Sequence, residues 1–222
     1  MKVLIVEDDL ALADQIANAV REAGYTVELA DDGEDGEFIG ATETIAAAVL
    51  DLGLPGIGGT EVLRRWRDAG FDFPVLILTA RDAWSDKVTA FRAGADDYVL
   101  KPFRMEEVVL RLSTLIRRSA GHATAELRAG ALVLDTATGL VTLQGMPVKL
   151  TAFEARLLRL LMLNMGRVIS RTELSEQMYD RDSDRDFRSL EVVIGRLRRK
   201  IGADRIETRR GEGYVLAASD PQ

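Results

Sequence analysis

Apolar and polar positions follow two different patterns along the chain, and the pattern changes near its middle. The first half alternates short continuous apolar runs, typical of strands buried on both faces, with stretches of helical periodicity. We expect strands at 3–6, 25–30, 46–50, 74–80 and 98–100, and helices at 10–24, 58–70, 86–94 and 105–119. This alternation predicts a doubly wound α/β domain whose five-stranded parallel sheet is covered by helices on both faces.

The second half has short alternating strands and three amphipathic segments. We expect strands within 127–150, helices at 151–164, 171–179 and 187–202, and a hairpin at 205–217. Thr151 and Glu154 predict a capping box at the start of the first of these helices. We interpret 120–125 as a linker, between an α/β domain at 1–119 and an α+β domain at 126–222.

Charge and composition support two domains with separate roles. Lys and Arg number 13 against 22 Asp and Glu in residues 1–125, a net charge of −9, whereas residues 126–222 carry 16 against 14, a net charge of +2. The chain has no Cys, which excludes disulfides, thiolate metal sites and Cys nucleophiles. No apolar run approaches the ~18 residues that span a bilayer, and the N-terminus does not resemble a signal peptide, so we expect a cytoplasmic protein with no membrane partner.

Polar side chains occur where four of the predicted strands of the first domain end. They are Glu7, Asp8, Asp9, Asp51, Thr79 and Lys101. Because the carboxyl ends of parallel strands meet at one edge of the sheet, where ligands bind in such folds, we expect these side chains to share one rim.

The chemistry of this rim suggests phosphoryl transfer. Neighbouring carboxylates repel one another unless a cation neutralises them, and an all-oxygen ligand set suits Mg²⁺ or Ca²⁺. We therefore predict that Asp51 is a nucleophile that accepts phosphate, with the metal bridging carboxylate and phosphoryl oxygens. Thr79 and Lys101 would each hold one phosphoryl oxygen. Taken singly, an acid such as Asp51 after a strand is more often a turn or cap residue, and an acid pair such as Asp8 and Asp9 is a common helix N-cap.

Motifs in both halves resemble one known family. IVEDD, LDLGLPG, LTARD and GADDYVLKPF, in this order and spacing, closely resemble the receiver domain of bacterial two-component response regulators. LTAFEARLL, GRVISRTEL, RSLEVVIGRLRRKIG and IETRRGEGYVL resemble the winged helix-turn-helix of the OmpR/PhoB subfamily. The resemblance covers essentially the whole chain. It implies a flavodoxin-like receiver followed by a DNA-binding domain, and a transcriptional regulator whose own chemistry is limited to gaining and losing a phosphoryl group.

The resemblance assigns roles at the rim. Asp51 is the implied phosphoacceptor, and Asp9 is a neighbour of the site. The implied Mg²⁺ ligands are Asp8, Asp51, the Gly53 carbonyl and, through water, Glu7. Thr79 is the implied switch hydroxyl, Lys101 pairs with the phosphate, and Tyr98 matches the aromatic switch residue that turns inward on phosphorylation.

The resemblance also implies that the receiver dimerises through its fourth helix, fifth strand and fifth helix. Charged residues that recur on this face are Lys87, Asp96, Asp97, Glu107, Arg111 and Arg118. We expect the pairs Lys87–Glu107, Asp97–Arg111 and Asp96–Arg118 between protomers. Exposed pairs are worth only ~0–1 kcal/mol each, so they would set register and partner choice more than affinity.

The basic helix at 187–202 is the candidate DNA-recognition element. We expect its apolar stripe, Leu190, Val193 or Ile194, Leu197 and Ile201, to pack on the core. The DNA-facing side chains are then expected to be Arg188, Ser189, Val192, Arg196, Arg199 and Lys200, with Arg209 and Arg210 on the hairpin as a wing. Gly195, in mid-helix, either allows close approach to DNA or is a neutral surface position.

Three other functions are weighed against this one. A phosphatase of the haloacid dehalogenase type needs a second acid where this chain has Gly53, and a dinucleotide-binding enzyme needs a glycine-rich motif where it has EDDLAL. The third is a regulator that dimerises and binds DNA without phosphate. The resemblance implies a sensor histidine kinase, double-stranded promoter DNA with tandem sites, RNA polymerase and a second copy of the chain as partners.

Overall fold

A computed structural model describes residues 1–80, 84–178 and 187–219, with only the backbone described for Ser85, Phe187, Arg188 and Ser189. The chain forms two units, Lys2–Ser119 and Ala120–Gln222, the second of which also includes Met1. Within the described ranges, no helix is both long enough and apolar enough to cross a bilayer.

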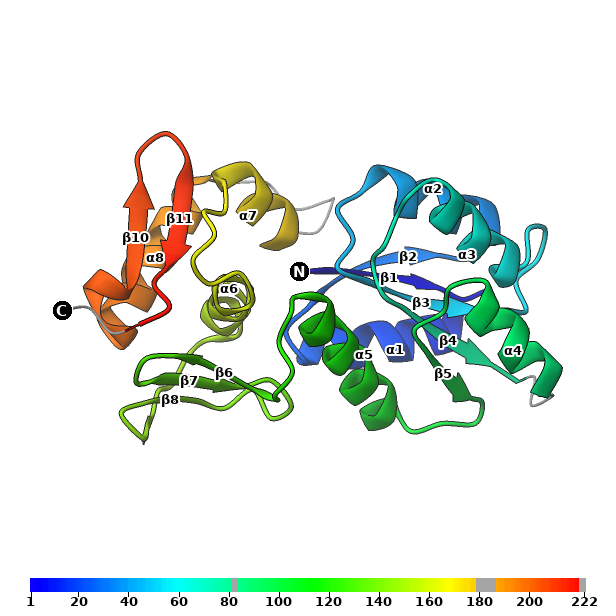
Figure 1. Ribbon diagram of the computed structural model, residues 1–222, viewed down its shortest axis with the longest axis horizontal. Helices are drawn as coiled ribbons and strands as arrows, with labels where there is room; N and C mark the ends of the chain where they lie inside the picture. The colour runs from blue at the N-terminus through cyan, green and yellow to red at the C-terminus, as the bar shows by residue number, and fades with distance from the viewer. Residues whose placement is uncertain (81–83, 179–186, 220–222) are drawn as a thin grey trace. The chain divides into compact units, whose positions relative to one another are not determined.

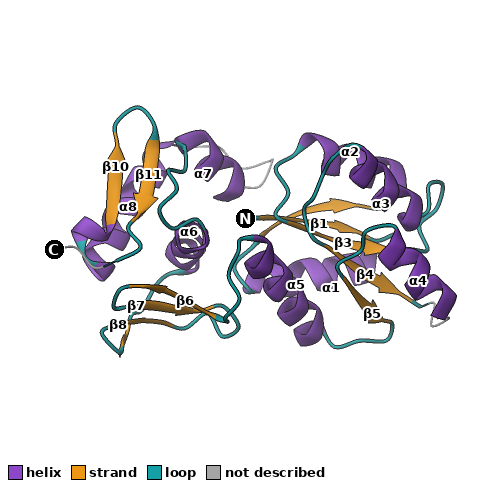
Figure 2. Cartoon of the chain, viewed as in Figure 1, coloured by secondary structure: helices purple, strands orange, loops and turns teal. Residues whose placement is uncertain are grey.

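A five-stranded parallel sheet with strand order β2-β1-β3-β4-β5 forms the centre of the first unit (Figures 1 and 2). The strands are β1 Lys2–Val6, β2 Thr26–Ala30, β3 Ala47–Asp51, β4 Val75–Thr79 and β5 Asp97–Leu100. Every residue of β1, β3 and β4 is buried. Burial on both faces explains why these strands are continuous apolar runs in the sequence.

Five helices follow the strands in turn and cover the sheet. They are α1 Leu10–Glu22, α2 Gly33–Thr42, α3 Gly59–Asp68, α4 Trp84–Arg92 and α5 Met105–Ser119. α1 packs beside α5, and α2 packs beside α3 on the opposite face of the sheet (Figure 1). The doubly wound α/β fold expected from the sequence is confirmed.

The apolar pattern did not predict α2. Its sequence, GEDGEFIGAT, has glycine where a core-facing helix normally has large apolar side chains. A Cβ built on Gly36 would lie 2.7 Å from Val6 Cγ1, and one built on Gly40 would lie 2.4 Å from Trp66 Nε1. The helix therefore lies too close to the sheet and to α3 for larger side chains, so glycines mark its buried face.

The second unit combines a small antiparallel sheet, three helices and a C-terminal hairpin. Its elements are β6 Glu126–Ala129, β7 Leu132–Asp135, β8 Val141–Leu143, β9 Met146–Pro147, α6 Ala152–Leu163, α7 Arg171–Met178, α8 Phe187–Ile201, a 3₁₀ turn Ala203–Arg205, β10 Ile206–Arg209 and β11 Gly213–Leu216. This is the arrangement of a winged helix-turn-helix, and the expected α+β class is confirmed.

Two local predictions for the second unit are also confirmed. The Thr151 hydroxyl accepts a hydrogen bond from Glu154 N, and the Glu154 carboxylate accepts one from Thr151 N, which is the capping box. The apolar stripe of α8 is buried and uses Ile194, while Val193 is only half-buried.

The hairpin is joined to the loop before α7 through its second strand. Ile169 N donates to Tyr214 O at 2.8 Å, and Tyr214 N donates to Ile169 O at 3.0 Å. A Cβ built on Gly213 would lie 1.9 Å from Ile169 O, so the close approach of these two backbones requires glycine.

Candidate functional site

The carboxyl ends of β1, β3, β4 and β5 bring together the polar residues that the sequence placed on one rim. The parallel register aligns Val6 with Leu50, and Thr79 with Leu100. Glu7, Asp51 and Thr79 are 2%, 7% and 1% exposed. Carboxylates this deeply buried need a partner, because a buried unpaired charge is strongly unfavourable.

Three of these carboxylates form a cluster that fits a hard cation. One carboxylate oxygen each from Glu7, Asp8 and Asp51 lie within 4.8 Å of one another. Glu7 and Asp51 are buried while Asp8 is exposed, so the cluster opens to solvent on one side. Oxygen-only donors with access to water are what Mg²⁺ prefers, since it usually keeps several of its waters.

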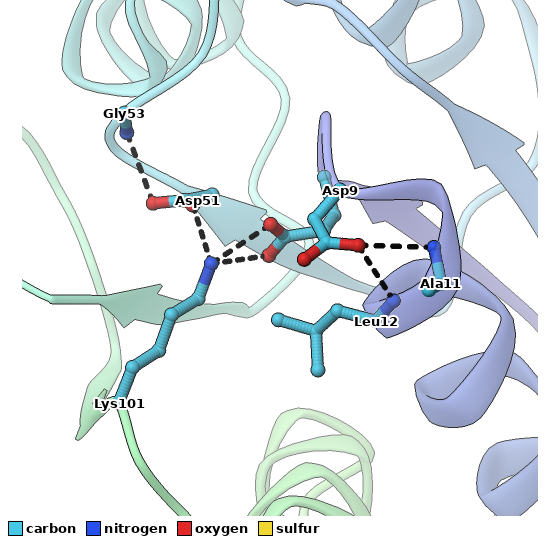
Figure 3. Close-up of polar contacts among 7 residues, drawn as sticks. Asp9, Ala11, Leu12, Asp51, Gly53 and Lys101 are labelled. Atoms are coloured by element: carbon cyan, nitrogen blue, oxygen red, sulfur yellow. Dashed lines mark hydrogen bonds and ion pairs between the residues drawn. The ribbon is translucent and has the colours of Figure 1, made fainter.

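Lys101 neutralises the two buried acids. Its Nζ donates to both oxygens of Glu7, at 2.8 and 2.7 Å, and to Asp51 Oδ2 at 2.6 Å (Figure 3). Burial raises the pKa of Glu7 above its ordinary value, and the negative charge of Asp51 adds to the rise, although the Lys101 hydrogen bond opposes it. Burial alone would lower the pKa of Lys101, but its hydrogen bonds to Asp51 and Glu7 and their charges together raise it.

Two residues of the rim also have the local roles that were left open. Asp51 Oδ1 accepts a hydrogen bond from Gly53 N at 2.9 Å, so Asp51 does have the turn role that was left open. Asp9 is the N-cap of α1, where its carboxylate accepts from Ala11 N and Leu12 N (Figure 3). Asp9 is thus engaged by the helix, in keeping with its assignment as a neighbour of the cluster.

The two expected switch residues lie on adjacent strands. Thr79 ends β4 with its side chain buried, and Tyr98 lies in β5, half-buried and packed against the core. The Lys87 ammonium lies 5.4 Å from the centre of the Tyr98 ring, a cation–π distance. One residue of the predicted dimer face, Lys87, therefore contacts the predicted switch tyrosine directly.

The face formed by β5 and α5 is rich in ion pairs within the single chain. Arg111 pairs with Asp97 at 2.9 Å and with Glu107 at 2.8 Å. The hydrogen bonds that Arg111 donates to these two carboxylates raise its pKa. Arg118, two turns further along α5 and lining the same groove, is exposed. Asp97, Glu107 and Arg111, which were expected to pair between protomers, therefore already pair within the chain.

Asp96 has a partner that the sequence analysis did not anticipate. Its carboxylate accepts from Val75 N at 2.8 Å and from Arg67 Nη2 at 3.2 Å. Arg67 also donates to Gly94 O and to Phe71 O, at 2.9 Å each, and so ties α3 to the loop before β5. Arg67 and Asp96 are far apart in the sequence, so no short-range pattern predicts their contact.

One side of α8 presents exposed residues one helical turn apart. Val192 is 51% exposed, and Arg196 and Arg199 are exposed on the same side, opposite the buried stripe. The side chains of Arg188 and Ser189, also expected to face DNA, lie outside the described residues. The described part of this side is therefore one apolar residue followed by two cations, in the order expected for base and phosphate contacts.

Two other basic residues of α8 are used inside the domain. Lys200 Nζ donates to Glu154 Oε2 at 2.6 Å and to Lys149 O at 3.0 Å, so it anchors α8 to the start of α6. Arg198 donates to Ile206 O at 2.9 Å and to Thr208 Oγ1 at 2.8 Å, which fixes β10 against α8. The role of Arg198 was not predicted, because only the exact phase of the helix distinguishes its position from those of its exposed neighbours.

The hairpin carries the two arginines expected at a wing. Arg209 is the last residue of β10 and pairs with Glu207 at 2.9 Å, and Arg210 lies in the turn that follows. Both are exposed. Because Arg198 ties the hairpin to α8, these arginines are held in a fixed relation to the exposed side of that helix.

Comparisons with known proteins agree with this geometry. The family model described as response regulator receiver domain matches residues 3–113, and the model described as transcriptional regulatory protein, C terminal, matches residues 145–216. The chain is 43% identical to the two-component response regulator PhoP of Pseudomonas aeruginosa, over 97% of this chain and 98% of that protein. It is 44% identical to the response regulator protein PmrA of the same species, over the full length of both.

A solved structure gives the same result for the first unit. The receiver domain of the Francisella response regulator 1452 superposes with a TM-score of 0.52 and 32% sequence identity, over 53% of this chain and 98% of that chain. That coverage corresponds to one of the two units. The relatives matched in sequence extend over both.

Proposed function

This chain belongs to the OmpR/PhoB subfamily of two-component response regulators, and from that premise we propose that phosphorylation of Asp51 controls its binding to DNA. The proposed donor is a sensor histidine kinase, the proposed ligand is double-stranded promoter DNA with tandem sites, and the setting is the cytoplasm. We assign the receiver to 1–119, the linker to 120–125 and the DNA-binding domain to 126–222. The relatives are regulators, and the chain acts as one, not as an enzyme with a separate substrate.

The observation that carries this proposal is the placement of Asp51 between an acid cluster and a lysine. Asp51 lies within 4.8 Å of Glu7 and Asp8, and 2.6 Å from Lys101 Nζ. Mg²⁺ held by Asp8, Asp51 and the Gly53 carbonyl, with Glu7 through water, would supply positive charge to the transferring phosphoryl oxygens. This placement supports the proposal that Asp51 is the nucleophile, that the acids hold the metal and that Lys101 is the cation for the product.

The transfer itself is a displacement at phosphorus. A carboxylate oxygen of Asp51 forms the new O–P bond while the bond from phosphorus to the donor breaks, and the donor group leaves with that electron pair. Lys101 then pairs with one phosphoryl oxygen, and the Thr79 hydroxyl donates to another. Loss of the phosphoryl group by attack of water on phosphorus returns Asp51 to its carboxylate.

The phosphoryl group draws Lys101 and Thr79 toward itself, and we propose that this signal reaches the dimer face through Tyr98. The Lys87 ammonium lies over the Tyr98 ring, so inward rotation of the ring would free Lys87 to pair with Glu107 of a second copy. Arg111 and Asp97 pair within the chain at 2.9 Å and would exchange for the same groups of the partner. Asp96 would pair with Arg118 only after release from Arg67.

Dimerisation would bring two DNA-binding domains to tandem half-sites about one helical turn apart. The proposed contacts are Arg188, Ser189, Val192, Arg196, Arg199, Lys200, Arg209 and Arg210. Of these, Lys200 contributes charge near the DNA while remaining bonded to Glu154. RNA polymerase is the proposed downstream partner.

The proposal is tested by the mass of the full chain in solution. Multi-angle light scattering would be run with and without Mg²⁺ and beryllofluoride, which mimics a phosphoryl group, alongside Asp51→Ala. We expect a dimer only when both reagents are present, and a monomer for the variant in every condition. A mass that does not respond to the reagents would favour the alternative function, a regulator that binds DNA without phosphate.

A further inference from the structure

Gly195 lies in the middle of α8, where the fold gives no reason for a glycine. The helix runs from Phe187 to Ile201 without interruption, and Gly195 has no positive φ. A Cβ built at this position meets no atom within 4 Å. Neither backbone conformation nor crowding therefore excludes alanine here.

The other glycines with open space around them, and the other glycines in helices, show how unusual this is within the described residues. Seven others also have open space around a built Cβ, and all of them have a positive φ that favours glycine: Gly24, Gly56, Gly70, Gly121, Gly145, Gly166 and Gly211. Glycines without a positive φ on helix α2, such as Gly36 and Gly40, have neighbouring atoms closer than 3 Å to a built Cβ. Gly195 has neither property.

Glycine in an exposed helix interior lowers helix stability relative to alanine, because its backbone loses more freedom on folding. The chain therefore carries a destabilising residue that its own packing does not require. A residue of this kind is explained when something outside the fold must approach the helix backbone closely.

The position of Gly195 indicates what approaches. It is half-buried on α8, next to exposed Arg196, and one turn away from exposed Val192 and Arg199. These are the residues that the proposed function assigns to DNA contacts. Because residue 195 has no side chain, the surface of the helix has a gap between the side chain of Val192 and those of Arg196 and Arg199.

We propose that Gly195 is a specificity-determining residue, at which the backbone of α8 touches the edge of a base pair in the major groove. This inference rests on the proposed DNA-binding function. A side chain at 195 would hold the helix away from the groove, so contacts that depend on close fit would be lost. Contacts from long, flexible cations to phosphates would adjust and survive.

The test compares Gly195→Ala and Gly195→Leu with the wild-type full chain. A duplex would first be selected from a randomised pool by wild-type protein with Mg²⁺ and beryllofluoride. The affinity of each variant would then be measured for that duplex and for an unrelated duplex, across a series of salt concentrations. Arg196→Ala is the contrasting variant, because loss of a phosphate-binding cation weakens binding to both duplexes and flattens the salt dependence.

We expect Gly195→Ala to bind the selected duplex roughly 10- to 200-fold more weakly, the range that one extra methylene produces in a fitted site, and Gly195→Leu to bind it more weakly still. Binding to the unrelated duplex and the salt dependence should stay within about twofold of wild type. The melting temperature of the DNA-binding domain should rise by about 4–8 °C in Gly195→Ala, which shows that the loss of binding is not a loss of folding.

Equal affinity of wild type and Gly195→Ala for the selected duplex would overturn the inference and leave the proposed function intact. If wild-type protein selects no duplex at all, both the inference and the proposed DNA-binding function are overturned. The two failures are therefore distinguishable in one series of experiments.

Discussion

Lys101 and Asp51 form an ion pair of 2.6 Å between Nζ and Oδ2, and the same ammonium bonds both oxygens of Glu7. The lysine thus neutralises the two buried acids of a cluster that also fits a divalent cation. Two cations that share the same carboxylates compete electrostatically. We therefore expect the affinity of the cluster for Mg²⁺ to depend on Lys101.

Replacement of Lys101 by methionine should raise the affinity for Mg²⁺ by about tenfold, because a competing positive charge is removed. The same variant should lose dimerisation with beryllofluoride, since the group proposed to pair with the phosphoryl mimic is gone. Calorimetric titration with Mg²⁺ measures the first effect, and light scattering the second. Lys149→Met, an exposed lysine of the other domain, is the control. Weaker Mg²⁺ binding in Lys101→Met would contradict this account of the pocket.

Arg67 and Arg64 should differ sharply in their effect on stability, although they are three residues apart on α3. Arg67 bonds two backbone oxygens and Asp96, whereas Arg64 is exposed and lies 3.7 Å from Glu61. We expect Arg67→Met to lower the free energy of unfolding of the receiver by about 2–3 kcal/mol, because partly buried carbonyls lose their donor. Arg64→Met should change it by no more than ~0.5 kcal/mol.

Urea unfolding of both variants, followed by tryptophan fluorescence, measures this difference. Trp66 is buried beside α2 in the receiver, so its emission responds to unfolding of that unit. Equal unfolding midpoints for the two variants would show that the link from α3 to the loop before β5 adds no stability.

Gly213→Ala and Gly211→Ala form a second matched pair, in the hairpin. Both glycines have positive φ, but only Gly213 is crowded, with Ile169 O at 1.9 Å from a built Cβ. We expect Gly211→Ala to destabilise the domain by ~1–2 kcal/mol, the strain of a left-handed alanine. Gly213→Ala should destabilise it by more than ~3 kcal/mol, because the backbone pairing with Ile169 must break. Thermal melting of each variant, with loss of DNA binding as a second readout, checks the order.

The Glu154–Lys200 pair should make the stability of the DNA-binding domain depend on pH. Burial alone would raise the pKa of Glu154, but hydrogen bonds from Lys200 and from Thr151 N hold it below its ordinary value of 4.5. For a carboxyl whose pKa is lowered in the folded state, the stabilisation is present above about pH 4.5 and is lost as pH falls through the folded pKa.

Lys200→Met should therefore flatten the fall in stability at acid pH while lowering stability at neutral pH. Denaturant midpoints measured from about pH 3 to pH 7 test this, with Lys149→Met as the control that keeps the pair. An unchanged acid dependence in Lys200→Met would mean that the pair does not hold the pKa of Glu154 down.

Residues with a local signal were predicted well from the sequence. Strand ends follow from apolar runs, so the meeting of Asp51, Thr79 and Lys101 at one rim followed once the sheet was predicted parallel. The capping box of Thr151 and Glu154 is also a short-range pattern. In each case the sequence signal that led to the prediction, a strand end or a cap pattern, lies within a few residues.

One helix and several contacts between residues far apart in the sequence were not predicted. α2 was missed because glycines take the place of large apolar side chains on its buried face. Gly36 and Gly40 let the helix approach its neighbours closely, so the sequence shows no apolar periodicity there. The partners of Asp96 and Lys200 lie 29 and 46 residues away, and only the folded chain brings them together. The sequence alone does not show which charged side chains pair inside the domain and which face a ligand. That distinction depends on the phase of each helix and on how it packs.

The most direct test of the central claim, that Asp51 accepts a phosphoryl group, is the intact mass of the full chain after incubation with acetyl phosphate. Samples would contain Mg²⁺ or a chelator, with Asp51→Asn as the matched variant. We predict the gain of one phosphoryl group in wild type with Mg²⁺, and no gain with the chelator or in the variant. The same gain in Asp51→Asn, or none in wild type with Mg²⁺, would contradict the account.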